Sequence, residues 1–239
     1  MRVAFVYDRV NKWGGAERVL LALHEIWPEA PLYTSVYNRE TSHWAKVFKV
    51  IPSFLQNFVF SKTNHEFYFW LMPFAFESFS FDEYDVVISL TSEAAKGIIT
   101  KPETLHLCYC LTPTRYLWSG YPDYFKGGVF RLLSWPAVAY LKKWDKLAAQ
   151  RPNSYLAISK TVQKRIKDYY GRESEVIYPP VELEKFEILN TKSETNTKYK
   201  IQNTKYFLVV SRLVKYKKVD LVIEAFNELG WNLLNLLYY

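Results

Sequence analysis

The chain has 239 residues, enough for one large domain or two modest ones, and its 49% hydrophobic and 23% charged residues are typical of a globular protein. Its formal net charge of +7 favours anionic partners such as nucleotides, phospholipid head groups and nucleic acid, without choosing among them. The two cysteines, Cys108 and Cys110, are too close together to cross-link a fold, and neither a signal-peptide pattern nor a run of ~20 apolar residues is present, so the simplest expected location is the cytoplasm.

The N-terminal part of the chain alternates predicted strands and helices. Val3 to Tyr7 is a short apolar run, and Gly14 and Gly15 follow it. Helical spacing of apolar residues begins at Ala16 and ends before Pro28, and a second strand is predicted from Leu32 to Tyr37. A strand, a glycine-containing turn, a helix and a strand in this order predict an α/β fold with a Rossmann-like, doubly wound parallel sheet.

The same alternation continues through the middle of the chain. Further strands are predicted at Tyr84 to Leu90, Leu105 to Leu111, Tyr155 to Ile158 and Val176 to Tyr178. Helices are predicted at Phe130 to Gln150 and at Lys160 to Tyr170, the second closed by Gly171. Phe54 to Phe81 is predicted as an aromatic helix with a break at Pro73, and Tyr116 to Gly128 as an irregular aromatic loop.

The composition changes after this domain. Residues 187–204 are polar and predict a linker between an N-terminal domain, residues 1–186, and the start of a second Rossmann-like domain, residues 205–239. In the second domain we predict a strand at Phe207 to Ser211 and a helix at Val219 to Leu229. The closing WNLLNLLYY is not predicted as the next strand. Because one strand and one helix cannot bury both faces of a parallel sheet, this region is not expected to fold alone.

Two motifs suggest phosphate binding. Gly14 and Gly15, at a strand-to-helix turn, would let the backbone approach a ligand near free helix N–H groups, although a tight turn without a ligand explains them equally well. Arg212 and Lys217 lie between a predicted strand and helix, where a guanidinium and an ammonium suit a diphosphate. The alternative for this second pair is a solvated basic loop.

A third motif follows the strand that contains the cysteines. Arg115 is placed to meet a phosphate, and Tyr116 and Trp118 to stack on a sugar, at the end of the strand where open α/β sheets bind ligands. The alternative is a packed aromatic loop. His106 alternates with the two cysteines on this strand, but positions ~6.6 Å apart cannot all reach one zinc ion through bonds of ~2.0–2.3 Å, so no metal site is predicted.

Aromatic residues make up 18% of the chain. One aromatic-rich group is expected to be core, with a peripheral membrane surface as the alternative: Phe67, Tyr68, Trp70, Leu71, Phe74 and Phe76. A basic rim for anionic lipid would come from Lys142, Lys143 and Lys146, whose alternative is a solvated helix face.

Several segments, taken in order, resemble a known family: GGAER after the first strand, YDVVIS, CYC-x-TP-x-RY-x-W, AISKTVQKRIKDYYG, VIYPPVELEKF and VSRLVKYKKVDLVIEAF. They resemble the family-four retaining glycosyltransferases of the GT-B fold, most closely the bacterial mannosyltransferase-like members that build surface polysaccharide. The resemblance runs from Met1 to about Gly230, and the order and spacing of the segments carry it.

The resemblance implies transfer of a hexose, mannose-like, from a GDP- or UDP-sugar to a glycan or lipid-linked acceptor, without a metal or other cofactor. Gly14 and Gly15 would approach the donor phosphates. Arg212 and Lys217 would bind the diphosphate and stabilise the leaving nucleotide electrostatically. In this family, retention of the configuration at the anomeric carbon is attributed to attack from the same face of the sugar, and a protein nucleophile plays little part. We therefore name no catalytic residue.

Two departures from the family pattern matter. Many relatives carry a histidine where this chain has Leu111, and that histidine would be expected to touch the transferred sugar. The family's donor domain also continues beyond the point where this sequence ends, to a Glu-x7-Glu motif that binds the donor's ribose. We therefore expect little activity from the chain alone.

Two other classes of function remain to be weighed. The chain would otherwise be a non-enzymatic acceptor-binding module, or the partner of a separate donor-domain chain. Nucleic-acid binding is not expected, because no recognised nucleic-acid motif accompanies the basic charge.

Overall fold

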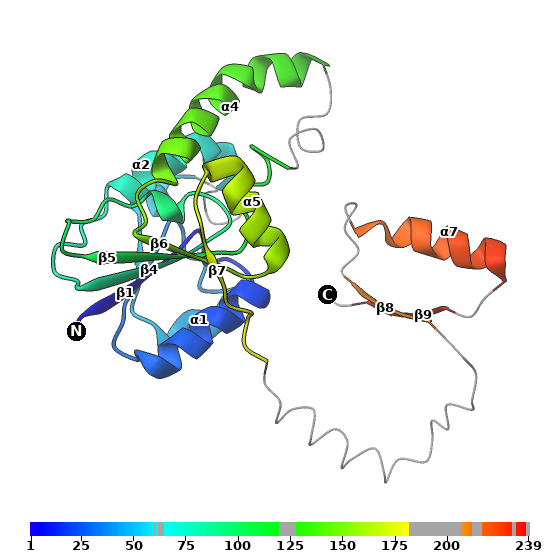
Figure 1. The fold of residues 1–239 in the computed structure, drawn as a ribbon, viewed down its shortest axis with the longest axis horizontal. Coiled ribbons are helices and arrows are strands. Elements are labelled where there is room, and N and C mark those ends of the chain that lie inside the picture. Colours follow the sequence, from blue (N-terminus) through cyan, green and yellow to red (C-terminus); the bar gives the residue numbers. More distant parts are fainter. Residues whose placement is uncertain are drawn as a thin grey trace, which may run out of the picture. The chain divides into compact units, whose positions relative to one another are not determined.

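The computed structural model describes residues 1–59, 61, 65–119, 128–181, 207–211, 217–230 and 233–237. The chain divides into two compact units, Met1–Val181 and Glu182–Tyr239, and Figure 1 shows the elements of each. The predicted linker over residues 187–204 lies outside the described residues, and the predicted domain boundaries stay predictions.

The first unit is built on a seven-stranded sheet in the order β3-β2-β1-β4-β5-β6-β7, and each neighbouring pair is parallel. The strands are β1 (Val3–Tyr7), β2 (Leu32–Thr34), β3 (Val50–Pro52), β4 (Val86–Thr91), β5 (Leu105–Cys110), β6 (Ser154–Ala157) and β7 (Glu175–Val176). The chain builds outward from β1 to β3, returns to the other side of β1, and then builds outward from β4 to β7. This order confirms the predicted Rossmann-like, doubly wound α/β fold.

Helices cover both faces of this sheet. In Figure 1, α1 (Gly15–Ile26) lies on one side, and α2 (Met72–Glu77) and α4 (Gly128–Ala148) lie on the other. The packing follows the alternation of β1. Phe5 packs in one cluster with Leu20 of α1, whereas Val6 packs in the other cluster with Phe76 of α2. Because both faces are buried at the centre of the sheet, β1 and β4 have almost uninterrupted apolar sequences, which is what made them visible in the sequence.

The last helix of the first unit is α5 (Lys160–Tyr170), which covers Cys108 and Cys110 of β5. Its predicted end is confirmed, since Gly171 caps it with a φ of 67°, the left-handed conformation that glycine adopts at least cost. Ser159 begins the helix by accepting a hydrogen bond from the N–H of Val162.

The aromatic segment differs from its prediction. Instead of one broken helix, the described part holds the short 3-10 helices η2 (Phe54–Asn57) and η3 (His65–Leu71) and then α2, where Pro73 occupies the first turn. Proline is tolerated there because the first N–H groups of a helix have no intrahelical partner. The edge strand β3 and the 3-10 helices η1 (His43–Val47) and η4 (Ala95–Gly97) were not predicted.

The second unit contains β8 (Phe207–Ser211), α7 (Val219–Leu229) and β9 (Leu233–Leu237). The expectation that no strand follows Gly230 was wrong, since β9 pairs in parallel with β8 from Phe207↔Leu233 to Ser211↔Leu237. Asn235 and the many leucines obscure this strand in the sequence, because neither residue favours strands and only the pairing with β8 distinguishes it.

Candidate functional site

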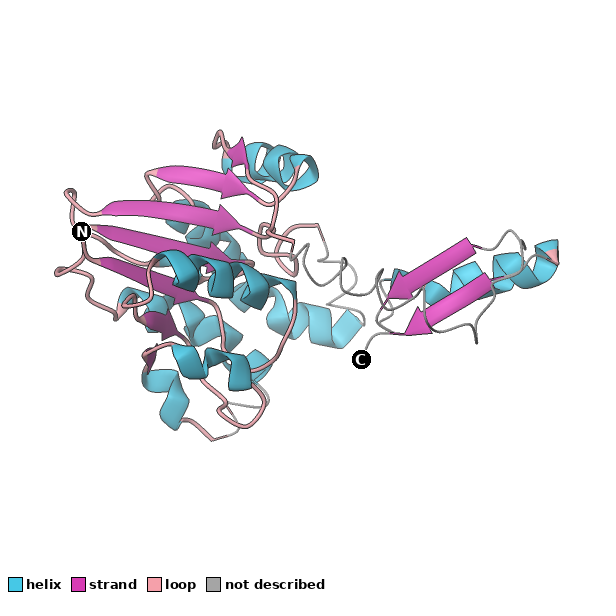
Figure 2. Ribbon diagram, turned by 90° about the horizontal axis from the view of Figure 1, so that it is seen from below, coloured by secondary structure: helices cyan, strands magenta, loops and turns pink. Residues whose placement is uncertain are grey.

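The order of the strands marks where a ligand would bind. Between β1 and β4 the chain switches direction across the sheet, so the loops that follow these two strands diverge and leave a crevice at their carboxyl ends. Figure 2 shows the arrowheads of the first unit's sheet pointing to the same side. The loops after β1, β4 and β5 therefore meet at this edge, which we call the switch-point edge.

Asp8 holds the loops after β1 and β4 together. The residue is 3% exposed, and its Oδ1 accepts hydrogen bonds from Thr91 Oγ1 and the N–H of Ala95, both at 2.9 Å. Oδ2 accepts from the N–H groups of Ser92, at 2.6 Å, and Glu93, at 3.0 Å. Burial and the Glu93 charge raise the pKa of Asp8, while the N–H donors oppose that shift. Asp8 is therefore a residue that shapes the site.

Arg9 and Glu93 form an ion pair at the same edge. Arg9 Nη1 lies 2.5 Å from Glu93 Oε1, and the side chains are 17% and 19% exposed. Burial lowers the pKa of Arg9, but Glu93 raises it further, and the net shift is upward, so the guanidinium stays charged. Its Nε atom is buried and has no hydrogen-bond partner. The pair thus combines a partly accessible cation with one donor that is not used.

Tyr116, predicted as a sugar-binding residue, comes to this edge from the loop after β5. Burial is the main cause that raises the pKa of its phenol, and the charge of Glu93 raises that pKa further. The phenol therefore lies within electrostatic reach of the ion pair. Its ring packs edge-on against Phe69, at 6.2 Å between centroids. Arg115 beside it is partly buried.

Trp118 lies in a packed cluster. Tyr169 stacks on its ring at 5.1 Å with an interplanar angle of 18°, and its Nε1 donates a 2.7 Å hydrogen bond to Asp145. Lys142 Nζ lies 4.8 Å from the ring centroid. The ring contacts are thus made within the protein, and the proposed stacking of Trp118 on a sugar stays a prediction.

A buried ion pair fixes the loop that carries Tyr116. Lys96 Nζ lies 2.5 Å from Asp145 Oδ1, with side chains 2% and 1% exposed, and Thr114 Oγ1 donates to the same oxygen at 2.7 Å. Burial lowers the pKa of Lys96, but Asp145 raises it and the net shift is upward. This network ties η4, the loop after β5 and α4 into one rigid wall of the site.

The two glycines of the first motif differ in their surroundings. A Cβ atom at Gly14 would lie 3.1 Å from Glu17 Oε2, and Glu17 is buried and accepts a 2.7 Å hydrogen bond from the hydroxyl of Tyr7. A Cβ atom at Gly15 would meet nothing within 4 Å. Gly14 is therefore partly explained by packing, whereas Gly15 has open space where a ligand would approach.

Two predicted phosphate-binding residues belong to the second part of the chain, and one departure from the family pattern follows β5. Arg212 lies outside the described residues, and Lys217 is exposed in the second unit. Leu111, which replaces the histidine of the resembling family, packs against the core on the α1 side, and its N–H donates to the carbonyl of Thr91 at 2.8 Å.

Sequence reasoning missed Asp8, Arg9 and Glu93. A signal was present, because the apolar run of β1 ends directly in Asp8 and Arg9, and Glu93 comes two residues after the end of β4. What the sequence lacked was the pairing of β1 with β4, which brings these positions together.

Within the described part of the chain, no group of three or more residues is arranged to hold a metal ion. His106 shares a 2.8 Å hydrogen bond with Ser89 Oγ, and burial lowers its pKa to about 3. Burial also raises the pKa of the Cys108 thiol to about 12. These buried polar side chains are therefore neutral parts of the core.

The aromatic group considered for membrane contact is divided. Phe76 is fully buried and Leu71 packs against the core, while Trp70 and Phe74 are 48% and 51% exposed. Among the helices that the structure describes, none has the length and apolar character needed to cross a bilayer. Peripheral membrane contact stays a prediction.

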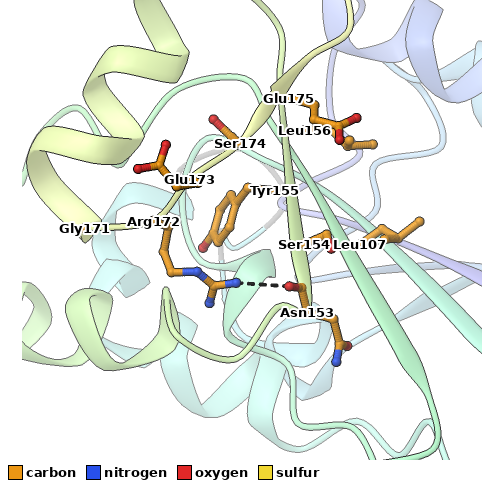
Figure 3. A pocket seen from close by; sticks show the side chains of 10 residues that line it. All are labelled: Leu107, Asn153, Ser154, Tyr155, Leu156, Gly171, Arg172, Glu173, Ser174 and Glu175. Carbon is orange, nitrogen blue, oxygen red and sulfur yellow. Dashed lines mark hydrogen bonds between the residues drawn. The ribbon is translucent and has the colours of Figure 1, made fainter.

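A separate pocket of about 710 Å³ lies beside the first residues of β6 and β7 (Figure 3). Its cation, Arg172, donates hydrogen bonds to the carbonyls of Pro152, Gln150 and Asn153 at 2.8, 3.1 and 3.1 Å. The pocket lies at the amino ends of these strands, away from the edge where α/β sheets bind ligands. Because Arg172 already has carbonyl partners, we assign the pocket no ligand.

Comparison with known proteins identifies the fold. No protein-family model and no curated protein matches the sequence. The structure is similar to Anabaena HepE in complex with UDP, with a TM-score of 0.54 and 15% identity over 95% of this chain and 58% of that chain. UDP-GlcNAc 2-epimerase from Neisseria meningitidis bound to UDP-GlcNAc gives a TM-score of 0.45 and 16% identity over 100% of this chain and 66% of that chain, and a score of this size does not establish a shared fold. The chain thus spans less than two thirds of either neighbour and shares its Rossmann-like fold with HepE.

Proposed function

We propose that this chain carries the acceptor-side domain and the start of the donor-side domain of a GT-B glycosyltransferase, which transfers a hexose, mannose-like, from a GDP- or UDP-sugar to a glycan or lipid-linked acceptor in surface polysaccharide synthesis. The observation that supports it is the fold shared with HepE, which was solved with UDP, together with the open backbone at Gly15 on the switch-point edge. Because the chain spans 58% of HepE, the proposed activity belongs to the whole transferase.

The chemistry would be divided between the two units. Gly14 and Gly15 of the first unit would let the donor phosphates approach the N-terminus of α1, where free N–H groups favour an anion. Arg212 and Lys217 of the second unit would stabilise the charge that develops on the leaving nucleoside diphosphate. Tyr116 would contact a sugar at the switch-point edge.

Nucleotide binding by the full chain tests this proposal. UDP, GDP and their mannose and glucose derivatives are titrated while chemical shifts and amide exchange are followed, and we expect weak binding that protects the turn before α1. The Cβ atom that Gly15→Ala adds has no neighbour within 4 Å, so the variant should keep the melting temperature of the chain. It should weaken nucleotide binding about tenfold, because the added methyl group obstructs only the ligand. Glu25→Ala, exposed at the other end of α1, is the matched control and should leave binding unchanged. Absence of nucleotide binding, or equal binding by Gly15→Ala, would overturn the proposal.

A further inference from the structure

Arg9 differs from the other cations described at the switch-point edge. It follows β1 directly, it is 17% exposed, and its Nε has no hydrogen-bond partner although the atom is buried. Buried donors are almost always paired in folded proteins, so an unpaired N–H at the edge where ligands bind calls for an acceptor from outside the chain. The planar guanidinium presents its donors in a fixed fork that matches a carboxylate or a phosphate.

We propose that Arg9 binds an anionic group of the acceptor, a phosphate or a carboxylate, and that Glu93 occupies this position when no acceptor is bound. This inference rests on the proposed function and adds to it the class of acceptor, one that carries an oxyanion near the hydroxyl that receives the sugar. Arg9 is thereby assigned as a residue that determines acceptor specificity.

The surroundings of Glu93 allow this exchange. Its backbone is held, because its N–H donates to Asp8 Oδ2 at 3.0 Å and its carbonyl accepts a hydrogen bond from Lys96 Nζ. Its carboxylate, in contrast, is held by Arg9 and is 19% exposed. The side chain can therefore turn away while the loop stays in place, and the guanidinium is released without unfolding the edge.

The charges around Arg9 predict a particular balance. Glu93 and the buried Asp8 are both acidic and lie near the Arg9 guanidinium, so an incoming anion competes with Glu93. Neutralising Glu93 should accordingly strengthen anion binding, and neutralising Arg9 should weaken it. A purely structural ion pair predicts no such opposition, because either change would only remove a contact.

The test uses two small probes, glucose 1-phosphate and glucuronate, titrated into the full chain with UDP present to keep them from the donor phosphate position. We expect Arg9→Gln to weaken binding of the preferred probe about tenfold and Glu93→Gln to strengthen it several-fold. Arg2→Gln, exposed at the other end of β1, removes the same charge and should change affinity less than twofold. Preference for the phosphate probe would indicate a lipid-linked phosphate acceptor, and preference for glucuronate an acidic sugar.

Three outcomes would overturn the inference: neither probe binds, Arg9→Gln behaves as Arg2→Gln does, or the Arg9 and Glu93 variants shift affinity in the same direction. Binding of UDP that depends on Gly15 would survive each of these outcomes. Failure of this inference and failure of the proposed function are thus separable.

Discussion

Two arginines at opposite edges of the same sheet show how context decides what a guanidinium does. At the amino ends of the strands, Arg172 donates to the backbone carbonyls of Pro152 and Asn153, and its Cζ lies 5.3 Å from the ring centroid of Tyr155. At the switch-point edge, where the carboxyl ends of the strands lie, Arg9 pairs with Glu93 and its Nε has no acceptor. The first arrangement stabilises the fold, whereas the second leaves a donor for a ligand. A pocket next to a cation is therefore a weaker sign of function than a cation whose hydrogen bonds are incomplete.

The largest loss of stability is expected at the buried Lys96–Asp145 ion pair beside the switch-point edge. Asp145→Ala leaves Lys96 charged and buried without a counterion, and the free energy of unfolding should fall by about 3–5 kcal/mol. Chemical denaturation measures the change. The double variant Lys96→Met/Asp145→Ala should lose clearly less, because it buries no unpaired charge. Equal losses in the single and double variants would contradict this account of the wall.

Substitution of the two arginines should change the free energy of unfolding by different amounts. Arg172→Met removes several charge-assisted hydrogen bonds to backbone carbonyls and should lower the free energy of unfolding by about 2–3 kcal/mol. Arg9→Gln removes one partly exposed ion pair and should cost about 0.5–1 kcal/mol. Denaturant unfolding of both variants gives the comparison, and a larger stability loss for Arg9→Gln would reverse the assignment of the two edges.

A further effect concerns the pH dependence of stability and involves His106 of β5. Its pKa in the folded chain is lowered to about 3 by burial and by the Arg151 charge, below its ordinary value of 6.5. The unfolded chain therefore binds a proton first, and stability is lost as the pH falls below 6.5. Between about pH 6.5 and about pH 5.5 this residue should account for a loss of about 1 kcal/mol.

The control is His106→Asn, in which the difference in unfolding free energy between these two pH values should shrink by that amount. Comparing differences rather than absolute stabilities removes any constant cost of the substitution. An unchanged difference would show that His106 does not titrate on unfolding.

Much of the fold was predictable because local patterns agreed with it. Lys160–Tyr170, Phe207–Ser211 and Val219–Leu229 have the predicted bounds, since capping residues and apolar spacing mark their ends. The strands β3 and β9 were missed because a short edge strand and a leucine-rich strand have no distinctive pattern and are defined by their partners.

The site was less predictable than the fold. Tyr116 was selected because it follows a strand, and the structure brings it within electrostatic reach of Glu93. Arg9 and Glu93 were missed because 84 positions separate them and only the register of β1 with β4 makes them neighbours. The register of β1 with β4 cannot be predicted from residue types and their spacing along the chain.

The hydrogen bonds of Asp8 have a consequence for how the protein folds. They join positions 83 to 87 residues apart, so the switch-point edge forms only after a long stretch of chain has closed and β1 has paired with β4. The amide hydrogens of Ser92, Glu93 and Ala95 donate to this one carboxylate and should exchange with solvent mainly when the whole unit opens. We therefore expect the crevice to be among the last parts of the first unit to form and to be lost together with the sheet, so that a partly folded chain would have no binding edge to offer.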